Sequence, residues 1–124
     1  LFPTGPVVVA RQLPDSHPVK KVALDFVTRY EAKHGPDTVT QFAGDAWGAW
    51  LLLDDASRRA LKSGAQPGTP AFRAALRDAI ESTHNLTVPN GVLNLSAQDH
   101  QGFDQRARVM GVVRNGKFAY AGDK

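Results

Sequence analysis

Three predicted helices with broad apolar faces dominate this sequence, and the strands it encodes are too few to cover them. The helices fill residues 18–84, and the first carries a single apolar stripe at helical spacing: Val19, Val22, Ala23, Phe26, Val27 and Tyr30. The second runs from about residue 38 to 62 and is apolar in nearly every direction over residues 39–53, which indicates burial on several sides. The third begins at Thr69-Pro70, a capping residue followed by proline.

Strands are predicted at the two ends of the chain. A β-branched run predicts one strand over residues 6–13. Residues 92–121 predict a short strand, at 92–95, and a C-terminal β-hairpin, because Asn115-Gly116 is a preferred pair for a two-residue turn. Residues 109–113 are apolar on both faces apart from one glycine, so we expect that strand to be covered on both sides. The predicted fold class is therefore α+β.

The parallel sheet that usually covers such helices is not encoded here. Either the helices pack mainly on one another, or a sheet comes from another chain or from another part of a longer protein. The sequence begins with Leu1, and no signal-peptide pattern follows it. We therefore expect a processed product or a piece of something longer. No apolar stretch of about 18 residues is present, so no membrane span is expected.

Several kinds of chemistry are disfavoured by the residues present. The absence of cysteine excludes disulfides and thiol catalysis, and the four histidines are too scattered to predict a metal site. Ser96, Asp99 and His100 lack the surrounding G-x-S-x-G motif, so we expect Ser96 and Asp99 to bond the backbone of a turn. A net charge of only +3, with no aromatic platform beside the hairpin arginines, argues against a nucleic-acid partner.

Gly44 and Gly48 lie four residues apart on one face of the second helix, each at a cost of about 1 kcal/mol relative to alanine. That cost has two explanations. Either a neighbouring helix or strand packs tightly against this face, or a ligand approaches it closely.

Six stretches of the sequence carry a family resemblance in their order along the chain. They are residues 5–14, the helix end 26–35, the stretch 42–49, the helix 72–79, the stretches 91–96 and 99–102 taken together, and the hairpin 112–117. Together they resemble the C-terminal portion of bacterial solute-binding proteins of the branched-chain amino acid type, the periplasmic receptors of ABC transporters. Trp47 and Gly48 stand where the family pattern has tyrosine and aspartate.

The resemblance implies a larger parent protein, a two-lobed, hinge-bending α/β receptor with the type I periplasmic binding fold. Residues 1–124 would be its C-terminal segment, and the missing strands would lie in the preceding part. Residues 6–13 would cross between the lobes, the helices of 18–84 would belong to one lobe, and the hairpin within 92–121 to the other.

The same resemblance implies a function without catalysis, metal or cofactor. The receptor would be periplasmic, would bind an amino acid or related small organic acid, and would deliver it to an ABC transporter permease. Phe42, Gly44 and Asp45 match the stretch that reaches the cleft wall: Phe42 or Asp45 would touch the ligand, and Gly44 would let it approach. The alternative is that Phe42 belongs to the core and Asp45 is a solvated helix residue.

A second functional hypothesis treats the chain as a stand-alone interaction module without a small-molecule ligand. Its exposed apolar helix faces would then be buried by another copy. On either hypothesis we expect the isolated chain to form a homodimer or a larger oligomer.

Overall fold

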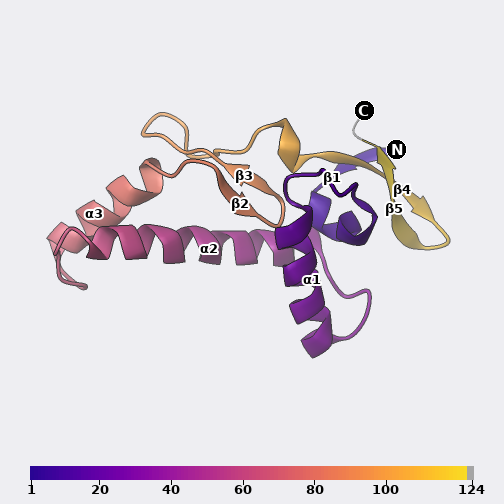
Figure 1. Cartoon of the computed structure of the whole chain (residues 1–124), viewed down its shortest axis with the longest axis horizontal. Helices are drawn as coiled ribbons and strands as arrows, with labels where there is room; N and C mark the ends of the chain where they lie inside the picture. The colour runs from indigo at the N-terminus through magenta and orange to yellow at the C-terminus, as the bar shows by residue number, and fades with distance from the viewer. Residues whose placement is uncertain (123–124) are drawn as a thin grey trace.

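The computed structural model describes residues 1–122, which form an α+β fold as predicted (Figure 1). A short strand, β1 (Phe2–Thr4), precedes the 3-10 helix η1 (Pro6–Gln12). Three α-helices follow: α1 (Lys20–His34), α2 (Gln41–Leu61) and α3 (Pro70–Glu81). The rest of the chain contains β2 (Leu86–Val88), β3 (Gly91–Leu93), the 3-10 turn η2 (Gln105–Ala107), β4 (Val109–Arg114) and β5 (Lys117–Gly122).

The strands form two small antiparallel sheets. One has the order β1-β4-β5, and the other is the β2-β3 hairpin. The predicted β4-β5 hairpin is confirmed, because Asn115 and Gly116 both have positive φ (51° and 74°), as a two-residue turn of this type requires. The expectation that β4 is covered on both faces is wrong near the turn, where Val113 is 57% exposed.

The predicted strand over residues 6–13 is wrong, since this segment folds as η1. Its β-branched residues favour a strand locally, but tertiary contacts override that preference. Val7, Val9 and Ala10 are buried in the core, and the Val7 amide donates to Asn90 Oδ1 rather than to a neighbouring strand (3.2 Å). Two three-residue strands, β1 and β2, were not predicted, and the strand expected at 92–95 is the shorter β3.

The three predicted helices are confirmed, with ends fixed by their caps. α2 begins at Gln41, later than its predicted start near residue 38, because Thr40 caps the helix: its hydroxyl accepts a hydrogen bond from the Ala43 amide (3.1 Å). Thr69 caps α3 in the same way through the Phe72 amide (3.2 Å). No helix within residues 1–122 has the length and apolar character needed to cross a bilayer.

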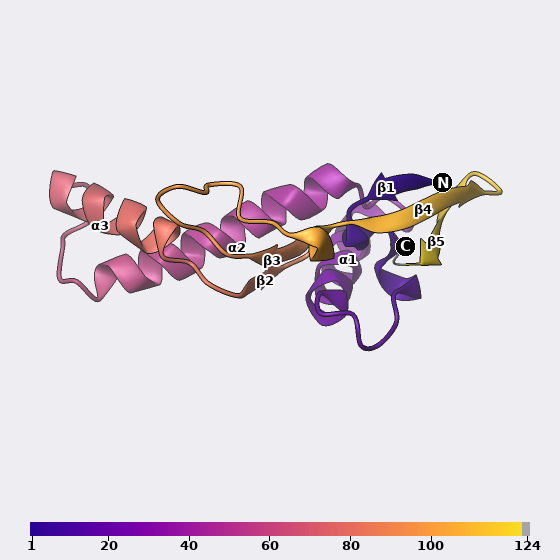
Figure 2. The same cartoon turned by 90° about the horizontal axis from the view of Figure 1, so that it is seen from above.

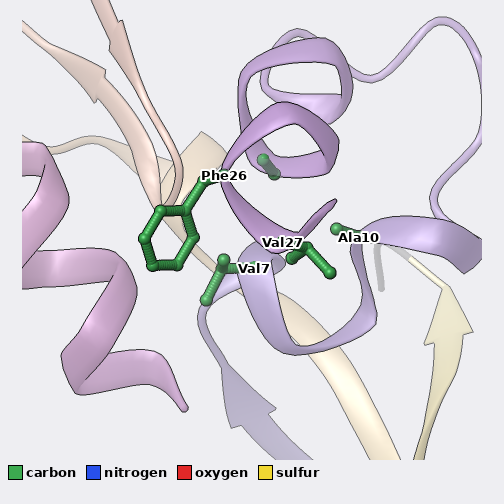
Figure 3. Packing of buried hydrophobic residues seen from close by; sticks show 5 residues of the cluster. Val7, Ala10, Phe26 and Val27 are labelled. Carbon is green, nitrogen blue, oxygen red and sulfur yellow. The ribbon is translucent and has the colours of Figure 1, made fainter. Parts of the chain in front are cut away.

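The core consists of separate small clusters rather than one large interior. In the first, η1 and α1 pack together, with the side chains of Val7, Phe26 and Val27 lying close to one another (Figure 3). The second joins η1 and the segment between η1 and α1 to β3 and β4, and the third joins α2 to α3 through small residues. The members of the second and third clusters are Val9, Leu13, Val19, Val92 and Val109, and Ala56, Ala60 and Ala79.

One face of α2 is bare, so the expectation that this helix is buried on several sides is wrong for residues 1–122. Its buried residues are Gly44, Gly48, Ala56 and Ala60, where the helix meets η1, β2 and α3. Phe42, Trp50 and Leu53 are 83%, 55% and 43% exposed. Figure 1 shows β2 and β3 along one side of α2, and Figure 2 shows α3 and the β4-β5 hairpin at opposite ends of an elongated molecule.

Candidate functional site

The first turns of α2 carry all three residues that the sequence singled out. Phe42 is 83% exposed, so it is not a core residue of this chain. Gly44 is buried, and Asp45 is exposed. Phe42 and Asp45 are three residues apart, which places them on neighbouring parts of the same helix surface.

A buried amide, that of Asn90, holds this end of α2 in place. Asn90 is only 4% exposed, and all of its polar atoms find partners on other elements. Its Nδ2 donates to the carbonyl oxygen of Gln41 (3.0 Å) and to Asp45 Oδ1 (2.6 Å), while its Oδ1 accepts from the Val7 amide (3.2 Å). One side chain therefore ties the β2-β3 turn to both α2 and η1.

The Gln41 side chain extends this network to β1. Its Oε1 accepts a hydrogen bond from the Gly5 amide (3.1 Å), at the junction between β1 and η1. A side chain at position 5 would not fit, because a Cβ there would lie 2.5 Å from Asn90 Oδ1. Three segments far apart in the sequence thus meet at the start of α2.

Tight packing explains both glycines of α2. A Cβ on Gly44 would lie 2.9 Å from Val7 Cγ1 and 3.0 Å from Asn90 Nδ2, and one on Gly48 would lie 3.3 Å from Val88 Cβ. Of the two explanations drawn from the sequence, close approach of neighbouring elements is the one the structure shows. A contact between Gly44 and a ligand stays a prediction.

The chemistry available at this end of α2 is an aromatic surface beside a carboxylate. Asp45 uses Oδ1 for Asn90, and no hydrogen bond to its Oδ2 is formed by residues 1–122. The exposed Phe42 ring provides an apolar contact surface. Together they offer one hydrogen-bond acceptor and one apolar surface to a bound molecule.

Ser96 and Asp99 bond the backbone of a local turn, as predicted. Ser96 Oγ accepts from the Asp99 amide (3.0 Å), and Asp99 Oδ1 accepts from the Gln101 amide (2.9 Å). His100 turns away from both and meets Glu81 Oε1 on α3 (3.1 Å). In the part of the chain that the structure describes, no three His, Cys, Asp or Glu side chains are placed to hold a metal ion.

A cavity of about 1170 Å³ lies away from the candidate residues, between β1, the loop before α1, η2 and β4. Its lining includes His17, Phe103, Arg106 and Arg108, and none of Phe42, Gly44 or Asp45. The Arg106 guanidinium donates to both oxygens of Asp104 and lowers the pKa of that carboxyl below its ordinary value. The expected ligand residues and this cavity are therefore separate features.

Comparison with known proteins gives a match at the level of solved structures. No protein-family model matches the chain, and no curated protein matches it. The structure of an extracellular ligand-binding receptor from Rhodopseudomonas palustris HaA2 has 36% identity and a TM-score of 0.89, over 96% of this chain and 33% of that receptor. A Rhodopseudomonas palustris CGA009 protein matches with the same identity and TM-score, over 95% of this chain and 33% of its own. A further HaA2 receptor structure matches with 36% identity and a TM-score of 0.83, over 97% of this chain and 33% of the receptor.

The chain is a homologue of extracellular ligand-binding receptors. It spans about a third of the length of each receptor that it matches. The predicted resemblance to solute-binding receptors, and the prediction of an α+β segment of one, are confirmed.

In this receptor homologue, the residue that organises the candidate site is one that the sequence did not single out. Pro89-Asn90-Gly91 reads only as a turn, and the turn is indeed present between β2 and β3. An asparagine at a turn is ordinary. Nothing local in the sequence indicates that its amide is buried and bonded to α2 and η1.

Proposed function

We propose that this chain is part of a receptor that binds a small solute in the periplasm and delivers it to an ABC transporter permease, without catalysing a reaction. The observation that carries the proposal is the 36% identity and TM-score of 0.89 to an extracellular ligand-binding receptor over 96% of the chain. The use of Ser96 and Asp99 as turn residues is in keeping with a protein that is not an enzyme.

The proposed mechanism is differential binding by two lobes. A ligand that contacts both lobes favours their closed arrangement and shifts the population toward it. Residues 1–124 would supply the C-terminal segment, with residues 6–13 crossing between lobes, the helices in one lobe and the hairpin in the other. The Asn90 network then joins the crossing segment to α2, because Asn90 bonds both Val7 and Gln41.

The ligand class we propose is an amino acid or a related small carboxylate. The Phe42 ring would cover its apolar part, and Asp45 Oδ2 would accept a hydrogen bond from an ammonium or another donor. Gly44 would leave room beside them. Support comes from the exposure of Phe42 and Asp45 on the same helical turn.

The test is ligand binding by the complete receptor that contains this chain. A thermal-shift screen against amino acids and small carboxylates should find a ligand that raises Tm, because a ligand selective for the folded state stabilises it by about 2.7 kcal/mol at a concentration of 100 Kd. If no compound of the panel raises Tm, the proposed ligand class is contradicted.

A single substitution tests the proposed contact between Phe42 and the ligand. Phe42→Ala should weaken binding of that ligand by about 5- to 30-fold, in line with about 1–2 kcal/mol of lost apolar contact. Leu61→Ala, at the other end of α2 and 51% exposed, is the matched control and should bind normally. Equal affinities of Phe42→Ala and the parent by calorimetry would remove Phe42 from the site.

The bare face of α2 favours one second candidate, the stand-alone oligomerising module. This alternative requires a discrete oligomer of the 124-residue chain, with a cooperative melt and no small-molecule ligand. Light scattering and the same ligand panel separate the two functions, because only the receptor responds to a small solute.

A further inference from the structure

The chain contains two Asn-Gly pairs, and each lies at the turn of a β-hairpin. Asn90-Gly91 lies between β2 and β3, and Asn115-Gly116 joins β4 to β5. An asparagine followed by glycine can lose its side-chain nitrogen without an enzyme, because the next backbone nitrogen can attack the side-chain carbonyl carbon. Glycine favours this attack, since it has no Cβ to obstruct the approach. The two pairs share this chemistry and differ in their surroundings.

The Asn90 side chain is buried and held in one position. Asn90 is 4% exposed, and its amide forms three hydrogen bonds, two to α2 and one to η1. Gly91 is packed as well, because a Cβ there would lie 2.7 Å from Phe103 Cδ1. For the backbone nitrogen of Gly91 to attack, Asn90 would first have to leave these partners, which requires local unfolding.

The surroundings of Asn115 are open. Its side chain is exposed and forms no hydrogen bond within residues 1–122. Apart from its chain neighbours, nothing lies within 4 Å of the position that a Cβ on Gly116 would take. The side-chain amide of Asn115 can therefore turn toward the Gly116 nitrogen without breaking a contact.

Two cationic side chains flank the exposed pair. Arg114 precedes it, and Lys117 follows it, with Lys117 Nζ 2.8 Å from Asp37 Oδ2. The Gly116 nitrogen gives up its proton as it attacks, so negative charge develops on it. Nearby positive charges stabilise that developing charge and favour the reaction.

The reaction consumes one water molecule and releases ammonia. The deprotonated Gly116 nitrogen forms a bond to Asn115 Cγ, the side-chain nitrogen leaves as ammonia, and a cyclic imide remains. Water then adds to one of the two imide carbonyl carbons and breaks its bond to nitrogen. Opening at Cγ gives aspartate, whereas opening at the backbone carbonyl gives isoaspartate, whose chain continues through the side chain.

We propose that Asn115 is a site of spontaneous deamidation to aspartate and isoaspartate, and that the fold protects Asn90. Isoaspartate lengthens the turn by one methylene group, so it disturbs the two-residue geometry that closes β4 on β5. The inference goes beyond the proposed receptor function and does not depend on it.

The test follows deamidation at both asparagines in one sample, so that neither site requires a variant. The chain is aged in neutral buffer, with and without urea, and its chymotryptic peptides are analysed by mass spectrometry; trypsin would cut on both sides of the pair, at Arg114 and Lys117. In the folded chain, Asn115 should react at least about tenfold faster than Asn90, and in urea the two rates should converge. Equal rates in the folded chain overturn the proposal, and so does a ratio that urea leaves unchanged.

The effect of isoaspartate on the hairpin is measured on the aged chain after chromatographic separation. The Ala119 amide, in the β4-β5 ladder, should exchange about fivefold faster in the isoaspartate form than in the parent. Asn115→Asp is the matched control, because it adds the same charge without lengthening the backbone, and its Ala119 exchange should match the parent's. Equal exchange in the isoaspartate form and in Asn115→Asp would contradict the proposed change at the turn.

Discussion

A single buried amide sets the geometry of the candidate site. Asn90 contacts α2 at two points and η1 at a third, and it is 4% exposed. A buried polar group without a hydrogen-bond partner lowers the stability of the fold. The buried partners of the Asn90 amide therefore need its hydrogen bonds. The orientation of Phe42 and Asp45 therefore follows from a residue on a different hairpin.

Asn90→Ala should lower the free energy of unfolding by about 2–4 kcal/mol, because it removes three hydrogen bonds and leaves the buried Val7 amide without an acceptor. Urea denaturation measures the change. The control is Gln98→Ala in an exposed loop, which should stay within about 0.5 kcal/mol of the parent. Equal stability of the two variants would show that the network contributes nothing.

At the scale of elements, α2 depends on two glycines that meet different surroundings. Gly44 faces Val7, a residue of η1 that is 1% exposed and belongs to the first core cluster. Gly48 faces Val88 at a distance close to ordinary contact. The same substitution should therefore have different effects one helical turn apart.

Gly44→Ala should destabilise the chain by about 1–3 kcal/mol, because its Cβ would lie 2.9 Å from Val7 Cγ1 and something must shift. Gly48→Ala should stay within about 1 kcal/mol of the parent, since its milder crowding is offset by alanine's helix propensity. Thermal or urea unfolding of both variants gives the comparison. A larger loss for Gly48→Ala would reverse our assignment of the tighter contact.

How far the sequence predicts the elements depends on whether their signals are local. The helices and the β4-β5 turn could be predicted, because apolar periodicity, capping threonines and Asn115-Gly116 act within a few residues. η1 could not, since what replaces strand pairing there is an amide 83 residues away in the chain. Likewise, strands as short as β1 and β2 exist only through partners that the local pattern does not reveal.

The ligand-binding role of Phe42, Gly44 and Asp45 stays a prediction, and only their place in the fold can be compared with the structure. The sequence pointed to the first turns of α2 through a resemblance, and the structure shows Phe42 and Asp45 exposed there. The parts that position them, Asn90 and the Gln41 side chain, act through contacts between distant segments. Their residue types alone are those of ordinary turns and helix starts.

At the scale of the whole molecule, the bare face of α2 is the dominant surface feature. Phe42, Trp50 and Leu53 are exposed on the helix, and exposed apolar surface of this kind is typical of a site that contacts a partner or a ligand. Within residues 1–122 each of the three stays at least 43% exposed. In a complete receptor the remaining two thirds of the chain would be available to do so.

We expect the isolated chain to elute as a dimer or a larger species, and Trp50→Glu to shift it toward the monomer by placing a charge on the bare face. Light scattering coupled to size exclusion measures both masses. Lys62→Glu adds the same side chain just beyond the end of α2 and should not change the mass. A monomeric parent chain, or a Trp50→Glu variant with the parent's mass, would contradict this prediction.

α2 is held at its first turn by Asn90 and further along by β2 and α3, so these elements would move with the helix when its first turn is adjusted. Its 21 residues extend about 30 Å from the Asn90 anchor toward α3. A rotation of about 5° at the anchor would displace the far end of the helix by roughly 3 Å. A small rotation where η1 meets Asn90 would therefore produce a larger displacement at α3. Spectroscopic labels placed on α3 would detect that displacement most sensitively.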